Sequence, residues 1–476
     1  MKVLLVGAEV SPLVKIGGLG DVMGGLPKAL QKLGLSIDVI VPFYSNIEIQ
    51  PDFYKCFDLN VSFAGENFRV GVFKTKLPGS EVRVFMLKND HFFSHGGIDA
   101  FSNNITETEM FMFFNKSVVE FIKSQFNVYD LVHCNDWHTG LITHLLNDEL
   151  GMTRPATLFT IHNVIFQGVG EVSSIADVGL NCNDHPLIDW DVSDGDLNMM
   201  LQGVSSSDYI STVSPSYAEE ILTEEFGGGL HDIFRSRKSR LVGILNGVDY
   251  SMLPRDYARY NVSQGKEDAK KLLCETLGVD KRIPHWQNVP IFSYIGRVDP
   301  GQKGLELLED LFLDPSFEDR AIFVFLGKGD FGWEERFKKI KNRNLFVNIL
   351  FDESLAIKMY AGSDFLLIPS KYEPCGLIQM MAMYYGTIPI ARNVGGLKDT
   401  VKDGVTGFCF EKYVISDFKN AVERALDLYD NRSALENLVH NCMSQDFSWD
   451  RSAKLYMKLY EKVVNIHNYS VRLAEM

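Results

Sequence analysis

The strongest constraint on the fold is a regular alternation of short apolar runs with longer stretches of helical spacing. The chain opens with one such unit: an apolar run at 2–8, a glycine-rich turn, a helical stretch at 21–33 and a second apolar run at 37–41. Later strand-like runs occur at 82–87, 130–133, 157–161 and 209–213. This alternation predicts β-α-β units and therefore a mostly parallel sheet.

A polar stretch at 246–288 interrupts the pattern, which restarts beyond it. Further strand-like runs follow at 290–295, 321–326, 345–350, 365–369 and 387–391. From about residue 415 the pattern is helical, and 449–467 has the spacing of an amphipathic helix. Because one hydrophobic core stops growing at roughly 250 to 300 residues, a chain of this length is expected to form two domains.

We predict an α/β fold with two Rossmann-like, doubly wound domains that face a central cleft. Residues 1–245 form the N-terminal domain, which a C-terminal helix at 456–476 completes, and residues 246–455 form the second domain. Open parallel sheets bind ligands at the carboxyl ends of their strands. Functional residues are therefore expected in the loops that follow strands.

The charge balance argues against two classes of partner. Lys and Arg total 47 against 62 Asp and Glu, which gives a formal charge of −15. That charge repels a nucleic-acid backbone and an anionic membrane, so neither is expected as a partner. A phosphorylated substrate would need cations placed locally, because the overall field opposes an anion. The oligomeric state is left open.

The cysteines are odd in number and scattered, without a Cys-x-x-Cys pair. They are Cys56, Cys134, Cys182, Cys274, Cys375, Cys409 and Cys442. Reduced thiols, as in the cytoplasm, explain this usage best. The apolar N-terminus is interrupted at Glu9, too early for a signal sequence, and no later apolar run has the length of a membrane span. We expect a cytoplasmic protein.

A glycine-rich loop follows the first strand and reads Lys15-Ile16-Gly17-Gly18-Leu19-Gly20-Asp21. Glycines let backbone N–H groups approach an anion at a helix N-terminus, and Lys15 adds a cation. The pattern is neither a Walker loop nor a complete dinucleotide fingerprint, so a plain turn with a surface lysine also fits it.

Two cations stand at another junction between a strand and a helix. Gly296-Arg297 ends the run at 290–295, and Gln302-Lys303-Gly304 opens the next helix. Two positive charges beside a helix N-terminus outline a clamp for a pyrophosphate. A strand-end arginine and a solvated lysine are the alternative, but the acidic net charge favours the clamp.

The second domain carries two more polar junctions. The segment 370–377 leaves the run at 365–369 and enters a helix through Gly376, which brings the Glu373 carboxylate to free backbone N–H groups. Such a combination suits the hydroxyls of a sugar, although capping of the helix by Glu373 fits equally well. Gly395-Gly396-Leu397 repeats the strand-to-helix design for an anion.

Polar residues also follow two strands of the first domain. His162 comes directly after the run at 157–161, and Asp136-Trp137-His138 follows the run at 130–133. A lone histidine is usually structural, but several polar residues at carboxyl strand ends favour a functional site.

Asp189-Trp190-Asp191 and Asp194-Gly195-Asp196 match the Asp-x-Asp pattern with which many sugar transferases hold a metal ion. Short acidic pairs arise easily by chance, and the cations above make a metal redundant. We interpret both pairs as a solvated loop and predict no metal site.

Several motifs occur in one order along nearly the whole chain. They are Glu9-Val10-Ser11-Pro12 before the Lys15 loop, Asn135-Asp136-Trp137-His138, Thr160-Ile161-His162-Asn163, Thr212-Val213-Ser214-Pro215, Asn246-Gly247-Val248-Asp249, Tyr372-Glu373-Pro374-Cys375-Gly376-Leu377 and Gly395-Gly396-Leu397. Together they resemble the bacterial glycogen synthases and plant starch synthases, a family of retaining glucosyltransferases with the GT-B fold.

The resemblance implies transfer of glucose from ADP-glucose to the non-reducing end of an α-1,4-glucan such as glycogen. Configuration at the anomeric carbon would be retained by same-face attack, without a covalent intermediate, a metal ion or another cofactor. The bacterial form of the motifs favours ADP-glucose over UDP-glucose as the donor.

The resemblance also implies roles for individual residues. The catalytic set would be Lys15, His162, Arg297, Lys303 and Glu373. The donor would be bound by Lys15, Gly17, Gly18, Arg297, Lys303, Phe351, Glu373, Cys375, Gly376, Leu377, Gly395 and Gly396, with Phe351 stacked on the base. The acceptor would be bound by Glu9, Asp136, His138, Asn163 and Asn246.

The chain departs from the family pattern at a few positions. Arg297 and Lys303 are six residues apart instead of five, because Pro300-Gly301 add a residue. Ile378 and Val394 stand where threonine is usual, Gln202 replaces a usual lysine, and the segment 91–96 lacks an arginine before its glycine. Three alternatives stay open: UDP-glucose as donor, a different acceptor such as a small sugar or a lipid, and a catalytically weak module that binds glucan or nucleotide sugar.

Overall fold

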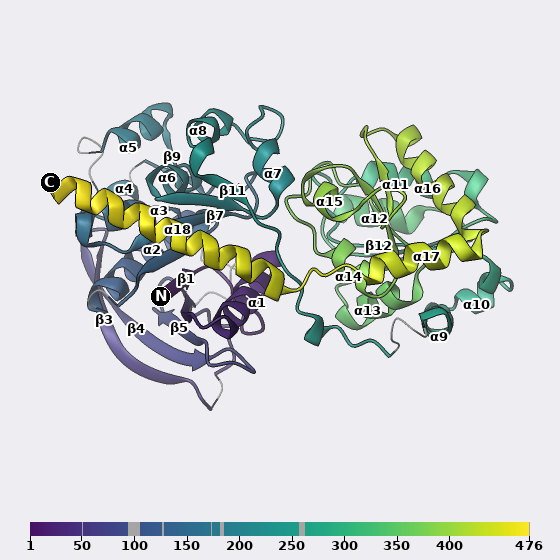
Figure 1. Ribbon diagram of the computed structural model, residues 1–476, viewed down its shortest axis with the longest axis horizontal. Coiled ribbons are helices and arrows are strands. Elements are labelled where there is room, and N and C mark those ends of the chain that lie inside the picture. Colours follow the sequence, from purple (N-terminus) through teal and green to yellow (C-terminus); the bar gives the residue numbers. More distant parts are fainter. Residues whose placement is uncertain are drawn as a thin grey trace. The chain divides into compact units, whose positions relative to one another are not determined.

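The computed structural model describes residues 1–49, 51–93, 105–125, 128–172, 174–180, 185–256 and 262–475. Cys182 and residues 94–96 of the segment 91–96 lie outside these ranges. The chain forms two compact units (Figure 1). Unit 1 comprises Met1–Gly247 and Trp449–Met476, and unit 2 comprises Val248–Ser448. The chain thus passes from unit 1 to unit 2 between residues 247 and 248 and returns between 448 and 449. The boundaries predicted from the sequence were 245/246 and 455/456.

The main sheet of unit 1 has the order β11-β10-β7-β6-β1-β2-β5-β4-β3 in the described part of the chain. Its strands are β1 (Lys2–Val6), β2 (Ser36–Pro42), β3 (Tyr54–Phe63), β4 (Glu66–Lys76), β5 (Arg83–Lys88), β6 (Leu131–Asn135), β7 (Ala156–Ile161), β10 (Tyr209–Thr212) and β11 (Leu241–Gly243). Neighbours from β11 to β5 pair in parallel, as predicted. The antiparallel hairpin of β3 and β4 extends the sheet beyond β5 and was not predicted.

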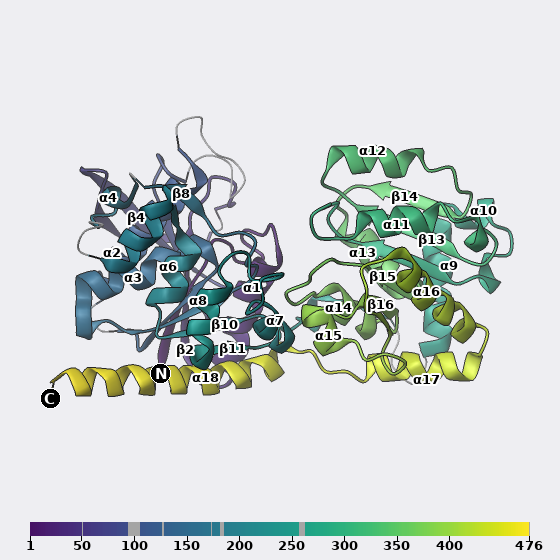
Figure 2. The same ribbon diagram turned by 90° about the horizontal axis from the view of Figure 1, so that it is seen from above.

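Helices cover both faces of this sheet. They are α1 (Gly18–Lys32), α2 (Glu107–Ser124), α3 (Gly140–Leu150), α4 (Ser174–Asp177), α5 (Pro186–Asp191), α6 (Met199–Ser206), α7 (Pro215–Glu220), α8 (His231–Ser236) and α18 (Trp449–Glu475). A short antiparallel pair, β8 (Val169–Glu171) and β9 (Asp196–Asn198), lies apart from the main sheet. The long helix α18 packs against α1 and β7, whereas α2, α3 and α6 pack together on the other face (Figure 2).

The apolar stripe of α18 explains why this last segment returns to unit 1. Trp449, Tyr456, Tyr460 and Val463 are spaced by three, four or seven residues and are buried. The Tyr460 hydroxyl and the Nδ1 atom of the buried His133 on β6 lie 2.8 Å apart. The helix therefore contributes to the core of unit 1 as well as covering it.

The sheet of unit 2 has the order β14-β13-β12-β15-β16-β17, and all its described neighbours pair in parallel. Its strands are β12 (Ile291–Ile295), β13 (Ile322–Gly327), β14 (Leu345–Ile349), β15 (Phe365–Ile368), β16 (Ile388–Arg392) and β17 (Phe408–Phe410). The five predicted runs correspond to β12 through β16, because strands buried on both faces are continuously apolar.

The helices of unit 2 form a layer on each face of its sheet. They are α9 (Val262–Leu277), α10 (Val279–Arg282), α11 (Leu305–Phe312), α12 (Phe331–Lys339), α13 (Glu353–Gly362), α14 (Ile378–Tyr384), α15 (Gly395–Thr400), α16 (Ile415–Tyr429) and α17 (Arg432–Met443). Contacts join α11 to α16 on one face and α9, α13, α14 and α17 on the other (Figure 1). The polar stretch at 246–288 contains two of these helices, α9 and α10. Within the described ranges, no helix is long and apolar enough to span a bilayer.

The two points where the chain leaves and re-enters unit 1 are neighbours. In unit 2, the N–H of Val248 donates to the carbonyl of Phe447 at 2.7 Å. In unit 1, a Cβ atom on Gly247 would lie 2.5 Å from Cα of Trp449, so only glycine fits there. Unit 2 is therefore an insertion between two adjacent positions of unit 1.

Each sheet has a topological switch point, where successive strands begin to add on the opposite side. In unit 1 it lies between β1 and β6, since the chain runs from β1 to β2 on one side and continues from β6 to β7 on the other. In unit 2 it lies between β12 and β15. Loops that follow the strands at such a point form the usual ligand crevice of open α/β sheets.

Candidate active site

The loop after β1 is organised around the carboxylate of Glu9. This buried carboxylate accepts hydrogen bonds from the backbone N–H groups of Ile16 and Gly17, the latter at 3.1 Å from Oε2. Burial raises the pKa of Glu9, although the amides of Ile16, Gly17 and Gly20 oppose that effect. An internal anion thus uses the amide of Gly17, a residue predicted to bind the donor. The assignment of Gly17 and Gly18 stays a prediction.

Lys15 is paired within the same loop. Its Nζ atom lies 2.8 Å from Oδ1 of Asp21, in the first turn of α1. Both side chains are about one-third exposed, so the pair is solvated and weak. Lys15 can therefore exchange Asp21 for another anion at little cost.

Asp136 directly follows β6 on the other side of the switch point. Its backbone has φ +62°, which is rare for a residue with a side chain and is typical of functional sites. The side chain is buried, and its Oδ1 oxygen makes no hydrogen bond of normal geometry to a described residue. Burial raises the pKa of Asp136 to about 7; the amides of Trp137, His162 and Asn163 oppose this shift and the nearby Glu9 adds to it.

His162 follows β7, the next strand of the sheet. Its Nε2 atom lies 3.1 Å from Oδ1 of Asn135, and burial lowers its pKa well below the usual value. His162 is therefore a neutral imidazole at physiological pH.

The remaining residues predicted to bind the acceptor differ in their surroundings. The ring of His138 stacks on Trp137 with centroids 4.1 Å apart, and its Nδ1 atom is buried without a described partner. Asn163 accepts a hydrogen bond from the N–H of Ile165 at 3.1 Å. Oδ1 of Asn246 is also buried without a described partner, and no described contact joins Asn246 to the other predicted residues.

The switch point of unit 2 is bridged by Lys303 and Glu373. Nζ of Lys303, in the loop after β12, lies 2.7 Å from Oε2 of Glu373, in the loop after β15. The hydroxyl of Ser370 donates to the same oxygen at 3.0 Å. Both charged side chains are largely buried, so the pair is screened little by solvent. No described residue donates to Oε1 of Glu373.

The extra residue between Arg297 and Lys303 is accommodated by a tight turn. Oδ1 of Asp299 accepts the N–H of Gly301 at 3.0 Å, and the carbonyl of Asp299 accepts the N–H of Lys303 at 2.9 Å. The turn leaves Lys303 in contact with Glu373. Arg297 is more than half exposed and donates to Oε1 of Gln302 at 3.1 Å.

Glycines hold the loops of unit 2 close together. Gly304 has φ +66°, and a Cβ atom there would lie 2.0 Å from the carbonyl oxygen of Pro369. The N–H of Gly396 donates to the carbonyl of Glu373 at 2.9 Å, and a Cβ on Gly396 would lie 2.1 Å from the carbonyl oxygen of Cys375. The loops after β12, β15 and β16 therefore form one cluster, with Gly395 beside Gly396 at the start of α15.

Backbone donors remain at the start of α14. Gly376 has φ +71°, and neither its N–H nor that of Leu377 donates a hydrogen bond to a described residue. Leu377 is the N-cap residue of α14 and Gly376 precedes it, and backbone N–H groups at the start of a helix lack intrahelical partners. They can bind an oxygen atom of a ligand.

Phe351 lies apart from this cluster. It follows β14 at the outer end of the sheet, with β13 between β14 and β12. Its ring is 80% exposed, which is unusual for a large apolar side chain. An exposed ring at the carboxyl edge is suited to stacking on a ligand.

The interpretation of Asp189 to Asp196 as a solvated loop is wrong for Asp191. This residue ends α5 and is buried, and its Oδ2 atom accepts hydrogen bonds from Gln202 at 2.6 Å and from the N–H of Asn198 at 3.1 Å. Burial raises the pKa of Asp191 to about 6. Gln202 thus serves a buried carboxyl group, which the sequence pattern does not reveal. Among the described residues, no cluster of three His, Cys, Asp or Glu side chains is arranged to hold a metal ion.

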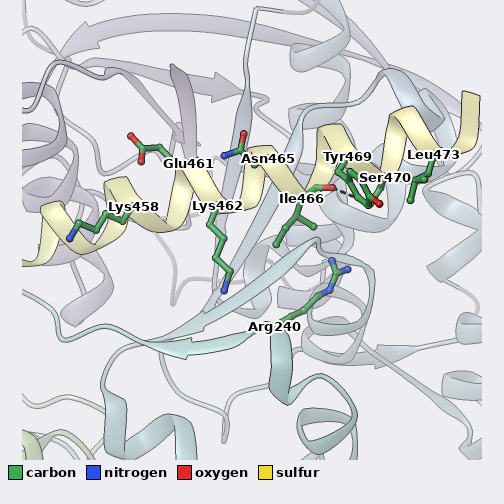
Figure 3. Close-up of a pocket in the computed structure, with 9 residues that line it drawn as sticks. All are labelled: Arg240, Lys458, Glu461, Lys462, Asn465, Ile466, Tyr469, Ser470 and Leu473. Carbon is green, nitrogen blue, oxygen red and sulfur yellow. Dashed lines mark hydrogen bonds between the residues drawn. The ribbon is translucent and has the colours of Figure 1, made fainter.

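A groove of about 810 Å³ runs along α18 (Figure 3). Arg240 lines it just before β11, so it lies at the amino edge of the sheet of unit 1. None of the predicted site residues lines this groove. The predicted residues are instead at the carboxyl edges of the two sheets.

Three residues that contact predicted site residues were not themselves predicted. Asn135 contacts His162, Ser370 holds Glu373, and Gln302 links Arg297 to the carbonyl of Tyr372 at 3.3 Å. Each is adjacent to a predicted residue or within three positions of one. Their closeness in sequence to predicted residues could have indicated them, but the contacts themselves depend on side-chain directions.

A family model described as the starch synthase catalytic domain matches residues 2–236, and one described as glycosyl transferases group 1 matches residues 280–439. The chain is 37% identical to the glycogen synthase of Fervidobacterium nodosum, over 97% of this chain and 99% of that one. It is 38% identical to the glycogen synthase of Thermotoga maritima, over 98% and 99% of the two chains.

A solved structure gives the same result. The catalytic domain of starch synthase IV from Arabidopsis thaliana, bound to ADP and acarbose, superposes with a TM-score of 0.87 and 31% sequence identity. The match covers 97% of this chain and 99% of that one. Sequence and fold agree along the whole length, so this chain belongs to the glycogen and starch synthase family of GT-B glycosyltransferases.

Proposed function

We propose that this protein transfers glucose from ADP-glucose to the non-reducing end of an α-1,4-glucan, with retention of configuration at the anomeric carbon. One observation carries the proposal: Lys303 and Glu373, a cation and a carboxylate suited to a diphosphate and a sugar, meet at the switch point of unit 2. Two relatives of nearly equal length are named glycogen synthase, and the starch synthase of similar structure is bound to ADP and acarbose.

The donor is assigned to unit 2. Lys303 has three N–H donors and uses one for Glu373, which leaves two for phosphate oxygens. The exposed guanidinium of Arg297 adds a second cation, and Lys15 of unit 1 a third. These charges would stabilise the nucleoside diphosphate as it departs.

The sugar and the base of the donor have their own groups. Lys303 and Ser370 both bind Oε2 of Glu373, so Oε1 is available to a glucosyl hydroxyl. The amides of Gly376 and Leu377 supply donors, supported by the packed backbone at Cys375, Gly395 and Gly396. Phe351 would stack on adenine.

The acceptor is assigned to unit 1. Glu9 and Asp136 are buried carboxyl groups at the ends of neighbouring strands, and each oxygen can accept a hydrogen bond from a sugar hydroxyl. His138, Asn163 and Asn246 add further polar groups. Unpartnered polar atoms on Asp136, His138 and Asn246 favour a polar ligand over an apolar one.

The proposed chemistry needs no protein nucleophile. The departing phosphate takes the proton of the acceptor hydroxyl, and attack occurs on the face from which the diphosphate leaves. Positive charge then develops at the anomeric carbon, and the neutral imidazole of His162 adds no repulsion to it. The three cations would act in place of a metal ion.

Release of nucleoside diphosphate from ADP-glucose and, in parallel, from UDP-glucose tests the proposal, each with and without glycogen. Glycogen-dependent release from ADP-glucose alone supports it. Release from UDP-glucose alone would show that the donor is UDP-glucose and not ADP-glucose.

A folded protein that releases neither diphosphate would favour a binding module. Val394 supports that alternative, because it caps α15 without a side-chain hydrogen bond where the family has a threonine.

A further inference from the structure

Two backbone carbonyls fix the orientation of the Asn135 side-chain amide. Its Nδ2 atom donates to the carbonyl of Val6 at 3.1 Å and to the carbonyl of His133 at 3.1 Å. If the amide were turned over, Oδ1 would face two carbonyl oxygens with no hydrogen between them. Oδ1 is therefore the atom that faces His162.

The amide orientation sets the protonation of the His162 ring. Oδ1 of Asn135 can only accept, so Nε2 of His162, 3.1 Å away, must carry a hydrogen. A neutral ring has one such hydrogen, which leaves Nδ1 with a free lone pair. No described residue forms a hydrogen bond with Nδ1.

The titratable groups around His162 agree with a neutral ring. His133 and His138 both have pKa values lowered to about 3, chiefly by burial, so they too are uncharged at pH 7. The carboxyl group of Asp136 faces the backbone N–H of His162. No described salt bridge links a carboxylate to the imidazole itself.

We propose that Asn135 is a positioning residue that holds His162 as the neutral Nε2–H tautomer and so presents Nδ1 as a hydrogen-bond acceptor to a substrate hydroxyl. The tautomer follows from the contacts of Asn135 alone. Its consequence for catalysis rests on the proposed function.

An amide suits this position better than a carboxylate. Asn135 orients the ring without adding charge, whereas Asp would stabilise the imidazolium. An imidazolium could not accept a hydrogen bond at Nδ1, and its charge would oppose an oxocarbenium-like centre.

The tautomer can be measured without substrate. In the full chain with ¹⁵N-labelled histidine, the ring signals of His162 are assigned from their absence in His162→Gln. We expect Nδ1 to have the shift of an unprotonated nitrogen and Nε2 that of a protonated one. In Asn135→Ala the two shifts should move toward each other, because both tautomers become populated. A protonated Nδ1 in the wild type, or unchanged shifts in Asn135→Ala, would overturn the proposal.

Kinetics test the consequence. Asn135→Ala should lower kcat roughly 10- to 100-fold, as loss of a hydrogen bond that orients a functional histidine typically does, with a smaller change in KM for the nucleotide sugar. Asn135→Asp should move the acidic limb of the pH–rate profile to higher pH, because it favours the imidazolium. Asn344→Ala is the matched control, since Asn344 is a buried asparagine of unit 2 that donates to the carbonyl of Ala321 at 3.0 Å.

The two arms fail separately. If the wild type transfers no glucose, the proposed function fails while the ring shifts still decide the tautomer. If Asn135→Ala does not fold, the wild-type shifts and the profile of Asn135→Asp decide. An Asn135→Asp profile that coincides with that of the wild type would refute the catalytic consequence.

Discussion

Nζ of Lys303 and Oε2 of Glu373 lie 2.7 Å apart and join the two loops that flank the switch point of unit 2. Each largely buried charge compensates the charge of the other in the protein interior. Removing one partner leaves the other as an uncompensated charge, so single substitutions affect both residues.

Lys303→Ala should lower kcat for glucose transfer, because stabilisation of the departing diphosphate is lost. We expect the activation free energy to rise by about 2 to 4 kcal/mol. Steady-state kinetics with ADP-glucose and glycogen measure this. Lys328→Ala is the control, since Lys328 is an exposed lysine just after β13. Equal kcat values for the wild type and Lys303→Ala would exclude Lys303 from the clamp.

Glu373→Gln should weaken recognition of the sugar more than binding of the nucleotide. The substitution keeps the shape but removes the charge that Lys303 and Ser370 contact. We expect KM for ADP-glucose to rise more than the dissociation constant of ADP, which calorimetry gives independently. If both constants rise by the same factor, Glu373 does not contact the sugar.

Asp136→Asn should change how stability depends on pH. The pKa of Asp136 is about 7 in the folded protein and about 4 in an unfolded chain, so the folded state binds more protons between those values. Stability of the wild type therefore falls as the pH rises from about 4 to about 7, by an amount on the order of 1 to 4 kcal/mol. Asparagine does not titrate, so Asp136→Asn should lack this contribution to the loss of stability with rising pH.

Thermal unfolding of both proteins between pH 4 and pH 8 measures the difference. Asparagine also tolerates a positive φ, so the backbone at position 136 is kept. The exposed Asp232→Asn serves as control. Parallel stability curves for the wild type and Asp136→Asn would contradict the raised pKa.

Tyr460→Phe should destabilise unit 1 by about 1 to 3 kcal/mol. The change removes the hydroxyl that lies 2.8 Å from Nδ1 of His133 and leaves a buried ring nitrogen without a partner. Tyr469→Phe, on the same helix with a ring that is 65% exposed, should change stability by less than about 0.5 kcal/mol. Denaturant unfolding compares the two variants, and equal losses would show that the buried hydroxyl is not needed.

The parallel strands could be predicted because they are buried on both faces. Ile322–Gly327 is buried along its whole length and appears in the sequence as a continuous apolar run. The hairpin of β3 and β4 has no such run, since exposed and buried residues mix along Tyr54–Phe63. Continuous apolar runs therefore do not predict an edge hairpin of this kind.

The strand ends that carry the predicted residues could be located from the sequence, but their side-chain contacts could not. Asp136 and His162 follow neighbouring strands of the sheet of unit 1, and Glu373 follows a strand of the sheet of unit 2. The carboxyl ends of parallel strands share one edge of their own sheet. Glu9 accepts hydrogen bonds from the backbone N–H groups of Ile16 and Gly17, and Asp191 accepts them from the N–H of Asn198 and the side chain of Gln202. These contacts depend on how each loop folds back on itself, which the spacing of residue types does not specify.

The adjacency of Gly247 and Trp449 makes unit 2 a removable cassette. A peptide bond or a short linker from 247 to 449 would close unit 1 without moving its ends, because their backbones already touch. The excised segment would begin at Val248 and end at Ser448, which form a parallel bridge. Recombination that exchanges this segment between related genes would replace the sheet of unit 2 and its loops in a single event. The packing of α18 on unit 1 would not change.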